Sequence, residues 1–445
     1  MNKNQPNQES NKSLNQIIDF RKEKLTKLRE AGVEPYPQKY EPTHFSADIL
    51  GDFDNLEKQD VDIAGRIMSM RKMGKASFFH IQDLKGKIQI FIRRDDVGED
   101  NYAHFKLLDM GDFVGVKGYV FKTKMGETSI HASELTVLCK SIRPLPVVKE
   151  KDGETFDAFA DKEQRYRNRH LDLIVNPEVK DTFVKRANII KGLRNHLDNM
   201  GFLEVETPVL QPLYGGANAR PFTTHHNALD QQLYLRIADE LYLKRLIIGG
   251  IDRVYEIAKD FRNEGMDRNH NPEFTMLEFY WAYADFEDNM NLVEDMIRAV
   301  ATSIDAIELQ WGDMTIDLSK PFERRPILDL LKEATGEDLT EASVDKMKEV
   351  CKTHHVDFED NANYGQMLDG LMSELVEPKL IQPTFITDYP KAISPLAKKH
   401  RNGNPHLVER FELFIGGAEF ANAFTELNDP IDQRERFESQ ARLAE

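Results

Sequence analysis

A single carboxylate stands inside a run of large apolar residues from position 274 to position 284. Strand alternation places Phe274, Met276, Glu278 and Tyr280 on one face of this run and mostly apolar residues on the other. A buried carboxylate costs several kcal/mol unless a positive charge lies beside it. We therefore expect Glu278 to pair either with a structural Arg or Lys or with the positive charge of a ligand.

The loop before this run concentrates charged residues and favours the ligand. Its sequence, RNEGMDRNHN, holds Arg262, Glu264, Arg268 and His270 within nine residues. An Arg at the end of a strand can bind phosphate or carboxylate oxygens through two parallel N–H bonds. The loop indicates an anion-binding site, and the alternative is an ordinary solvated loop of the same composition.

A second pair of carboxylates lies in RFELFIGGAEFANAFTELND, residues 410–429. If Gly416 and Gly417 form a two-residue hairpin turn, Glu419 pairs with Phe414, and Glu412 lies diagonally on the same face. Two carboxylates this close repel each other unless a cation bridges them. Mg²⁺ bound to a nucleotide polyphosphate is a common solution.

Two further polar residues follow on the second arm of this hairpin. Asn422 and Glu426 share one face, but strict alternation puts that face opposite Glu419. These side chains therefore line one cavity only if the strand contains a bulge or a strong twist.

Mixed helices and strands must position these residues. We expect an amphipathic helix over residues 180–200, a strand in GFLEVETPVL closed by Pro208, and two strands within residues 253–285. Residues 285–380 are mostly helical in pattern. Strands with interspersed helices indicate an α+β domain built on an antiparallel sheet, to which we assign residues 180–445.

A separate segment, residues 61–146, contains five β-like runs divided by turn residues, with Gly86 and Gly126 in turns. This pattern is typical of a small β-barrel of the OB type. The segment holds 14 Lys+Arg against 10 Asp+Glu, a net charge of +4, whereas the whole chain carries −17. Because OB barrels often bind oligonucleotides, we favour nucleic-acid binding over a purely structural barrel.

The remaining segments flank this barrel. Residues 1–16 are rich in Asn, Gln and Ser and are expected to be disordered. Residues 17–60 comprise a basic amphipathic helix from Ile17 to Ala31 and a connector. Residues 147–179 are expected to form a linker.

Composition excludes several classes of protein. Charged residues make up 30% of the chain, and neither a long apolar run nor an apolar N-terminal segment is present. We therefore expect no membrane span and no secretory signal. Cys139 and Cys351 are the two cysteines, which excludes a disulfide scaffold and a Cys-based zinc site. Neither a P-loop nor a GxGxxG after a strand occurs.

The sequence resembles the class II aminoacyl-tRNA synthetases, and among them the bacterial-type lysyl-tRNA synthetases. GFLEVETPVLQP is similar to motif 1 of this class, and FRNEG followed by HNPEFTMLEFY is similar to motif 2. ANAFTELNDPIDQRERF is similar to the segment before motif 3. YGGANARPFTTHHNALD and LRIADELYLKRL are similar to the intervening blocks. The resemblance covers nearly the whole chain, including the barrel.

The resemblance implies an enzyme that activates L-lysine with ATP to lysyl-adenylate and transfers it to the 3′ end of tRNA(Lys). Arg262 would be the catalytic residue, holding the ATP α-phosphate and the lysine carboxylate. Glu264 would bind the adenine amine, Phe274 would stack on the adenine ring, and His270 would lie near the distal phosphates. Glu412 and Glu419 would bind Mg²⁺.

For lysine itself, the resemblance implies a pocket with a subsite for each charged group. The α-amino group would contact Gly216 and Glu240, the carboxylate would contact Asn422 as well as the Arg of motif 2, and the ε-ammonium would contact Glu278, Tyr280 and Glu426. Two carboxylates and a phenol suit a substrate with a positive tip, whereas an aspartyl pocket would need a cation.

The resemblance also implies a tRNA anticodon site on the barrel, where Phe78 would stack on the central uridine and Arg71, Gln89 and Glu134 would contact base edges. It implies a cytoplasmic homodimer that associates through motif 1, with Leu203, Val205 and Pro208 near the two-fold axis.

The chain departs from the family pattern at its C-terminus, where motif 3 is absent. The GIDR of residues 250–253 enters motif 2 and is not that element. We expect the chain to be a fragment rather than a natural truncation. Two alternatives to the ligase stay open: a catalytically impaired tRNA-binding or regulatory form, and a lysyl ligase that acts on a protein.

Overall fold

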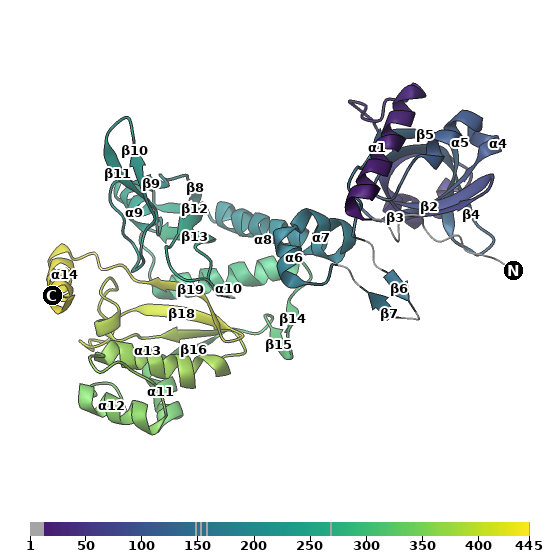
Figure 1. The fold of residues 1–445 in the computed structure, drawn as a ribbon. Helices are drawn as coiled ribbons and strands as arrows, with labels where there is room; N and C mark the ends of the chain where they lie inside the picture. Colours follow the sequence, from purple (N-terminus) through teal and green to yellow (C-terminus); the bar gives the residue numbers. More distant parts are fainter. Residues whose placement is uncertain (1–12, 147–148, 152–153, 157–158, 268, 445) are drawn as a thin grey trace. The chain divides into compact units, whose positions relative to one another are not determined.

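The structure of the chain, a computed structural model, describes residues 13–146, 149–151, 154–156, 159–267 and 269–444. The chain divides into two compact units, Met1–Lys180 and Asp181–Glu445 (Figure 1).

The first unit begins with helix α1 (Leu14–Glu30). The Ser13 side chain accepts a hydrogen bond from the backbone N–H of Gln16, and the Gln16 side chain accepts one from the backbone N–H of Ser13. Because this capping box satisfies N–H groups at the helix start, the helix begins before the expected Ile17. Residues 14–16, expected to be disordered, are therefore helical, and residues 1–12 lie outside the described residues. Two short helices follow, α2 (Ser46–Gly51) and α3 (Phe53–Leu56).

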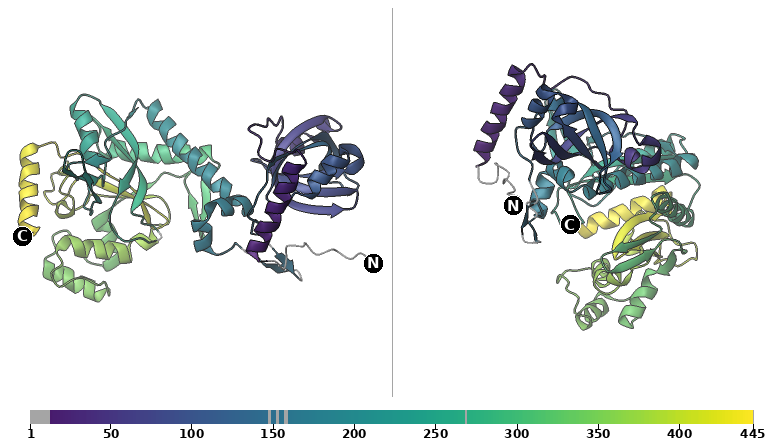
Figure 2. Two further views of the ribbon diagram at one scale, coloured as in Figure 1. Left: turned by 45° about the horizontal axis from the view of Figure 1, so that its top comes forward. Right: turned by 90° about the vertical axis from the view of Figure 1, so that its right-hand side faces the viewer.

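Five strands close into the expected barrel, in the order β1-β2-β3-β5-β4. They are β1 (Asp60–Met73), β2 (Ala76–Gln82), β3 (Lys87–Arg93), β4 (Phe113–Lys122) and β5 (Thr128–Cys139). Helices α4 (Arg94–Val97) and α5 (Glu99–Lys106) connect β3 to β4. Alternate residues such as Ile63, Phe79 and Ile90 fill the barrel core, so the strand alternation leaves their neighbours on the outer face. The two further views show α1 lying along the outside of this barrel (Figure 2).

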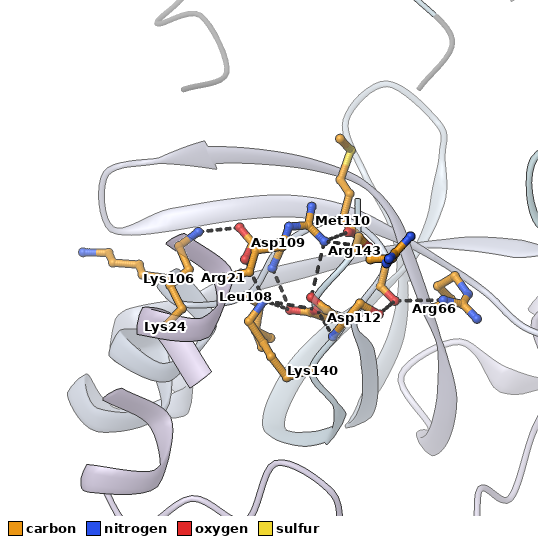
Figure 3. Close-up of polar contacts among 12 residues, drawn as sticks. Arg21, Lys24, Arg66, Lys106, Leu108, Asp109, Met110, Asp112, Lys140 and Arg143 are labelled. Atoms are coloured by element: carbon orange, nitrogen blue, oxygen red, sulfur yellow. Dashed lines mark hydrogen bonds and ion pairs between the residues drawn. The ribbon is translucent and has the colours of Figure 1, made fainter. Parts of the chain in front are cut away.

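A buried network of charged groups joins α1 to the barrel (Figure 3). The side chain of Lys140 is fully buried, and its Nζ lies 2.6 Å from Asp109 Oδ2 and 3.0 Å from Asp112 Oδ2. Lys24 of α1 also pairs with Asp109, and Arg21 of α1 donates to three backbone carbonyls of the barrel and its exit segment. Buried ions of this kind need all of their partners, so the network fixes α1 against the barrel.

Regular elements occupy much of the expected linker at residues 147–179. Strands β6 (Lys149–Lys151) and β7 (Glu154–Phe156) pair antiparallel. Helices α6 (Lys162–Arg167) and α7 (Arg169–Val175) follow, and the buried carboxylate of Asp172 accepts a hydrogen bond of 2.7 Å from Arg165 Nε. This stretch is therefore not a bare connector.

Helix α8 (Glu178–Asn199) matches the expected helix over residues 180–200. The strand expected in GFLEVETPVL is wrong in extent, because it is divided into β8 (Leu203–Glu204) and β9 (Leu210–Gln211), which lie in different sheets. Between them, Thr207 donates its N–H and its hydroxyl to Glu256 at 3.1 and 2.7 Å, and Pro208 has no N–H to donate. Strand pairing therefore stops at these residues.

The two expected strands of residues 253–285 are β12 (Arg253–Phe261) and β13 (Glu273–Trp281), paired antiparallel. Leu277, Phe279 and Trp281 pack in a cluster with residues of α8 and of helix α10 (Phe286–Ser303), as expected for the apolar face. Before β12 lie strands β10 (Thr223–His226) and β11 (Gln231–Leu235) and helix α9 (Glu240–Ile248).

A four-stranded sheet carries the second half of the site, in the order β16-β17-β18-β19. Its strands are β16 (Glu323–Pro326), β17 (Thr384–Thr387), β18 (Arg410–Ile415) and β19 (Ala418–Phe424). One face of β18 packs on α10 through Phe411 and Leu413, and Phe414 joins the cluster formed by the helices on the other face (Figure 1). These helices are α11 (Ile327–Thr335), α12 (Val344–Thr353) and α13 (Tyr364–Leu375).

The region expected to be mostly helical, residues 285–380, also contributes strands. β14 (Glu308–Trp311) and β15 (Met314–Asp317) form a hairpin, and β16 pairs parallel with β17. The sheets of this unit therefore include parallel pairs beside the expected antiparallel ones. Helix α14 (Pro430–Ala444) ends the described chain.

Candidate active site

Three carboxylates from three elements converge beside β13. Glu278 lies on β13, Glu240 begins α9, and Glu426 follows β19. Repulsion from all three raises the pKa of the buried Tyr280 phenol well above its usual value, after the larger effect of burial. The structure therefore brings together four of the residues assigned to lysine binding, and they form an acidic pocket.

Among the described residues, Glu278 forms no ion pair with an Arg or Lys side chain, although Arg262 is near enough to lower its pKa. Its Oε2 atom is buried and has no hydrogen-bond partner in the part of the chain that the structure describes. Burial, followed by repulsion from Asp260 and Glu240, raises its pKa to about 7. Of the two expectations for Glu278, a structural Arg or Lys partner or a ligand, the geometry favours the ligand.

Gly216 lies directly against Glu240. Its φ of +90° belongs to the left-handed region, and a Cβ placed on it would come within 2.9 Å of the Glu240 Cβ and 3.2 Å of the Ala238 Cβ. A side chain at this position would push into the pocket wall. Gly216 therefore leaves backbone exposed beside Glu240, as its assignment to the α-amino subsite requires.

Lys244 also reaches this pocket, although sequence reasoning did not select it. Its Nζ lies 2.7 Å from Glu240 Oε1 and 2.9 Å from Glu426 Oε2. A spacing of four residues from Glu240 on the same helix was the available signal, since such residues are neighbours on a helix surface. Glu426 is distant from Lys244 in sequence, so no local sequence pattern predicts this contact.

A second layer of buried charge lies beneath the pocket. The carboxylates of Asp239 and Asp260 are fully buried beside Arg236, whose nitrogens lie 3.1 and 3.4 Å from them. Burial, then repulsion from Asp260, raises the pKa of Asp239 to about 8. The single positive charge of Arg236 cannot compensate these two carboxylates and Glu256 together. This layer therefore adds to the negative potential at Glu278.

Arg262 lies between the acidic pocket and the second carboxylate pair. Its positive charge lowers the pKa of both Glu278 and Glu419, although larger effects raise them overall. Its guanidinium lies 5.0 Å from the centre of the Phe274 ring, and its Nε donates to the Ile237 carbonyl at 3.4 Å. Arg262 and Phe274 thus form one surface that could hold a planar base and an anion.

The structure leaves the other two residues assigned to ATP exposed in the loop after β12. Glu264 is exposed, and His270 Nδ1 lies 2.7 Å from Asp267 Oδ2. Arg268, also in this loop, lies outside the described residues. The side-chain partner of His270, Asp267, therefore lies within the loop itself.

The hairpin of residues 410–429 has the expected turn and the required bulge. Phe414 pairs with Glu419 across Gly416 and Gly417, whereas Leu413 pairs with Ala421, so Phe420 is the extra residue of a bulge. Further along, Asn422 pairs with Glu412. Because the bulge reverses the alternation, Glu412, Glu419 and Asn422 share one face, which strict alternation would have forbidden.

Glu412 and Glu419 remain an imperfectly compensated pair on that face. Glu412 accepts hydrogen bonds from Arg410 Nη2 at 2.5 Å and from the Tyr389 hydroxyl at 2.7 Å. Loss of hydration, then repulsion from Glu412, raises the pKa of Glu419 to about 7, although part of its surface reaches solvent. Carboxylate oxygens are the ligands Mg²⁺ prefers, so the pair fits this ion. Within the described residues no group of three or more acidic, His or Cys side chains could hold a metal, so water or phosphate would complete the coordination.

An aromatic surface lies on the outer face of the barrel. The rings of Phe78 and Phe91 are 4.8 Å apart, and those of Phe91 and His131 are 4.9 Å apart. Arg71 on β1 pairs directly with Phe78 on β2, so the two side chains share a face. Such a row of rings beside a cation suits stacked bases of a single-stranded nucleic acid.

Two of the residues assigned to base edges have different side-chain partners. Gln89 Nε2 donates to Glu127 Oε2 at 2.6 Å, on the aromatic side. Glu134 instead accepts from Lys117 Nζ at 3.1 Å, beyond a bulge in the β4–β5 pairing. Glu127, which sequence reasoning missed, is therefore the carboxylate that the structure joins to Gln89. It lies in the β4–β5 turn, where strand alternation gives no signal.

Comparison with known proteins agrees with this geometry. Residues 161–445 match the family described as tRNA synthetases class II (D, K and N), and residues 61–138 match the OB-fold nucleic acid binding domain. A "Lysine--tRNA ligase" from Porphyromonas gingivalis strain W83 is 52% identical over 96% of this chain and 75% of its own length. One from Carboxydothermus hydrogenoformans is 51% identical over 95% of this chain and 86% of its own. Among the described residues, no helix is long and apolar enough to cross a membrane.

Proposed function

The chain belongs to the class II tRNA synthetases of the D, K and N group, and from this premise we propose that it joins L-lysine to tRNA(Lys) at the expense of ATP. The observation that carries this proposal is the acidic pocket, in which the buried Oε2 atom of Glu278 has no hydrogen-bond partner among the described residues. The relatives that cover most of the chain carry the matching name, Lysine--tRNA ligase.

The pocket selects among the three amino acids of the family description. An aspartate side chain would meet Glu278 and Glu426 with a like charge. An asparagine side chain would leave both carboxylates desolvated and unpaired, at a cost of several kcal/mol. A lysine ε-ammonium supplies the missing positive charge, with the Tyr280 hydroxyl as a further hydrogen-bonding group.

The reaction takes place in two steps. A carboxylate oxygen of lysine attacks the α-phosphorus of ATP, the bond to the β-phosphate oxygen breaks, and pyrophosphate leaves. The terminal ribose hydroxyl of the tRNA then attacks the carbonyl carbon of lysyl-adenylate, and AMP leaves. Arg262 holds the α-phosphate and the lysine carboxylate together and stabilises the charge that develops between them. Phe274 stacks on adenine, with Glu264 at its amine and His270 near the distal phosphates.

The remaining assigned residues fix the substrates. Glu240 and Gly216 hold the α-amino group, and Asn422 approaches the lysine carboxylate. Glu412 and Glu419 would hold Mg²⁺, which when bound screens the charge of the polyphosphate.

The barrel supplies the tRNA contact. Phe78 stacks on the central base of the anticodon, and Arg71, Gln89 and Glu134 contribute contacts to the anticodon stem-loop. This nucleic-acid surface favours tRNA over a protein acceptor. Because the reaction supplies protein synthesis, we also propose a cytoplasmic location.

A second copy of the chain is the proposed partner at motif 1. Leu203 is 52% exposed, and its neighbours Val209 and Leu210 are 39% and 49% exposed. Pro208 is also exposed, and Val205 is half-buried. An exposed apolar segment of this kind fits a homodimer interface.

Amino-acid-dependent exchange of pyrophosphate into ATP tests the substrate. We expect exchange with lysine and none above background with aspartate or asparagine, and a preference for either of the latter refutes the assignment. Transfer to tRNA(Lys) transcripts tests the acceptor. Charging should fall when the central anticodon base is changed, and charging that ignores this base would exclude the proposed barrel contact.

A further inference from the structure

One lysine of the chain lies inside the proposed lysine pocket. Lys244 Nζ bridges Glu240 and Glu426, at 2.7 and 2.9 Å, and lies 5.8 Å from the centre of the Tyr280 ring and 5.7 Å from that of Phe424. Two of these groups, Glu240 and Glu426, are the proposed partners of the two ammonium groups of the substrate. The pocket therefore contains an ammonium group before any substrate enters.

This ammonium group is held in place and stays charged. Lys244 lies one helical turn after Glu240 on α9, and its side chain is 27% exposed. Burial by itself would lower the pKa of Lys244, but Glu426 and Glu240 raise it above its usual value. Its contact with Glu426 links α9 to the segment after β19, on the opposite wall of the pocket.

The charges of the pocket balance only when Lys244 is counted. Glu240, Glu278 and Glu426 carry three negative charges when ionised. A bound lysine brings two positive charges to them, since its own carboxylate is assigned to Arg262 and Asn422. Lys244 supplies the third positive charge, so that each of these three glutamates has a positive charge to match it in the occupied pocket.

We propose, resting on the proposed function, that Lys244 is a positioning residue for lysine. It supplies the third positive charge of the pocket and, by bridging Glu240 and Glu426, holds each carboxylate at the place where one ammonium group of the substrate binds. Two unmatched negative charges then remain, which suits a ligand that carries two ammonium groups.

Lysine binding to the K244M variant, measured by titration calorimetry, tests this role. Methionine keeps the length and apolar stem of the side chain, so Tyr280 and Phe424 retain their packing. We expect lysine affinity to fall about tenfold or more, because Glu426 loses its bridge. The KM for ATP in pyrophosphate exchange should stay within twofold of the wild-type value.

The number of protons released on lysine binding gives a readout that structural damage alone would not move. This number is obtained from the heats of lysine binding measured in buffers of different ionisation enthalpy. With a pKa of about 7, Glu278 is half-protonated at pH 7, so the wild type should release about half a proton. In K244M an extra carboxylate takes up a proton, and release should rise toward about one and a half. The other titratable or charged groups that face the pocket, unchanged in this variant, are Asp239, Tyr280, Asp260 and Arg262.

Two further variants test whether the effects of K244M come from the lost positive charge. K244R keeps the charge and should recover most of the affinity and the wild-type proton count. K244M combined with E426Q removes one charge of each sign, so it should return the proton count toward the wild-type value while lysine affinity stays low. K346M is the matched control, because Lys346 on α12 also bridges two glutamates, Glu337 at 3.1 Å and Glu349 at 3.5 Å, outside the pocket.

Several results would overturn the inference. Unchanged affinity and proton release in K244M would show that the bridge has no role. Tighter lysine binding in K244M would make Lys244 a competitor for the site rather than a positioning residue. If K244M does not fold, two other results would overturn the inference. One is failure of K244R to bind lysine, and the other is a proton count in the double variant that stays away from the wild-type value. Failure of the wild type itself to bind lysine would instead refute the proposed function.

Discussion

Replacing Glu278 with Gln should have opposite effects on binding and on stability. Glu278 is buried on β13, and its Oε2 has no partner within the described part of the chain. The change from its ordinary pKa of 4.5 to about 7 corresponds to about 3 kcal/mol of destabilisation of the ionised carboxylate in the folded, ligand-free protein. A lysine ε-ammonium offsets this cost when it binds. Under the proposed function, the same carboxylate therefore destabilises the free protein and is required for lysine binding.

Glu278→Gln should therefore lower kcat/KM for lysine by about two to three and a half orders of magnitude, since removal of one partner from a buried ion pair costs about 3–5 kcal/mol. Pyrophosphate exchange at varied lysine concentration measures this loss. Binding of tRNA should be unaffected. Glu273→Gln is the matched control, because this glutamate lies on the same strand but its side chain is 57% exposed.

The free energy of unfolding of the ligand-free variant should change in the opposite direction, toward higher stability. The folded-state pKa of Glu278 is above the unfolded value, so its contribution is most favourable below about pH 4.5 and is lost as the pH rises through about 7. At pH 8, Glu278→Gln should raise the free energy of unfolding by as much as about 3 kcal/mol, and the gain should shrink toward pH 5. Denaturant unfolding at both pH values measures it. A variant less stable than wild type at pH 8 would refute the reasoning, because it would mean that Glu278 has a structural partner.

Three other changes test separate parts of the structure. Phe78→Ala should weaken tRNA binding by about 1–3 kcal/mol while lysine-dependent exchange stays unchanged, as measured by filter binding and exchange; equal loss of both would point to misfolding. Lys140→Met should lower the stability of the barrel by about 3–5 kcal/mol, measured by hydrogen exchange of its strands in the full chain, because it leaves the fully buried carboxylate of Asp112 without its ammonium partner. Lys85→Met, which removes an exposed ion pair, should cost less than about 1 kcal/mol and serves as its control. Gly216→Ala should raise the KM for lysine by tenfold or more, because its Cβ would lie 2.9 Å from the Cβ of Glu240, and an unchanged KM would remove this glycine from the α-amino subsite.

Local sequence patterns were sufficient for much of the fold. The five barrel strands were predicted from five β-like runs divided by turn residues, and the structure closes them into a barrel whose core is filled by alternate residues. β13 was likewise predicted from a strand-like run, and its alternation placed Glu278 on the face opposite the apolar cluster. The strand in GFLEVETPVL was wrong in extent because Thr207 bonds to Glu256, a residue distant in sequence, instead of to a neighbouring strand.

The hairpin at residues 410–429 shows where such patterns end. Its turn and the pairing of Phe414 with Glu419 follow from two adjacent glycines. The bulge at Phe420 does not, because an extra residue is accommodated only by the partner strand and the packing on either face. Sequence could state that a bulge was required for Glu419 and Asn422 to share a face, but only the structure located it.

The sequence by itself determined which residues are candidates for the chemistry: isolated carboxylates such as Glu278, an Arg at a strand end, and an aromatic barrel strand are all visible without coordinates. The tertiary structure decided which of them meet. Glu127 rather than Glu134 lies beside Gln89, and Lys244 spans the pocket to Glu426. The physical reason is the separation along the chain over which each effect acts. Periodicity and propensity act over a few residues, whereas the electrostatic compensation of a buried charge depends on groups brought within about 4 Å from anywhere along the chain.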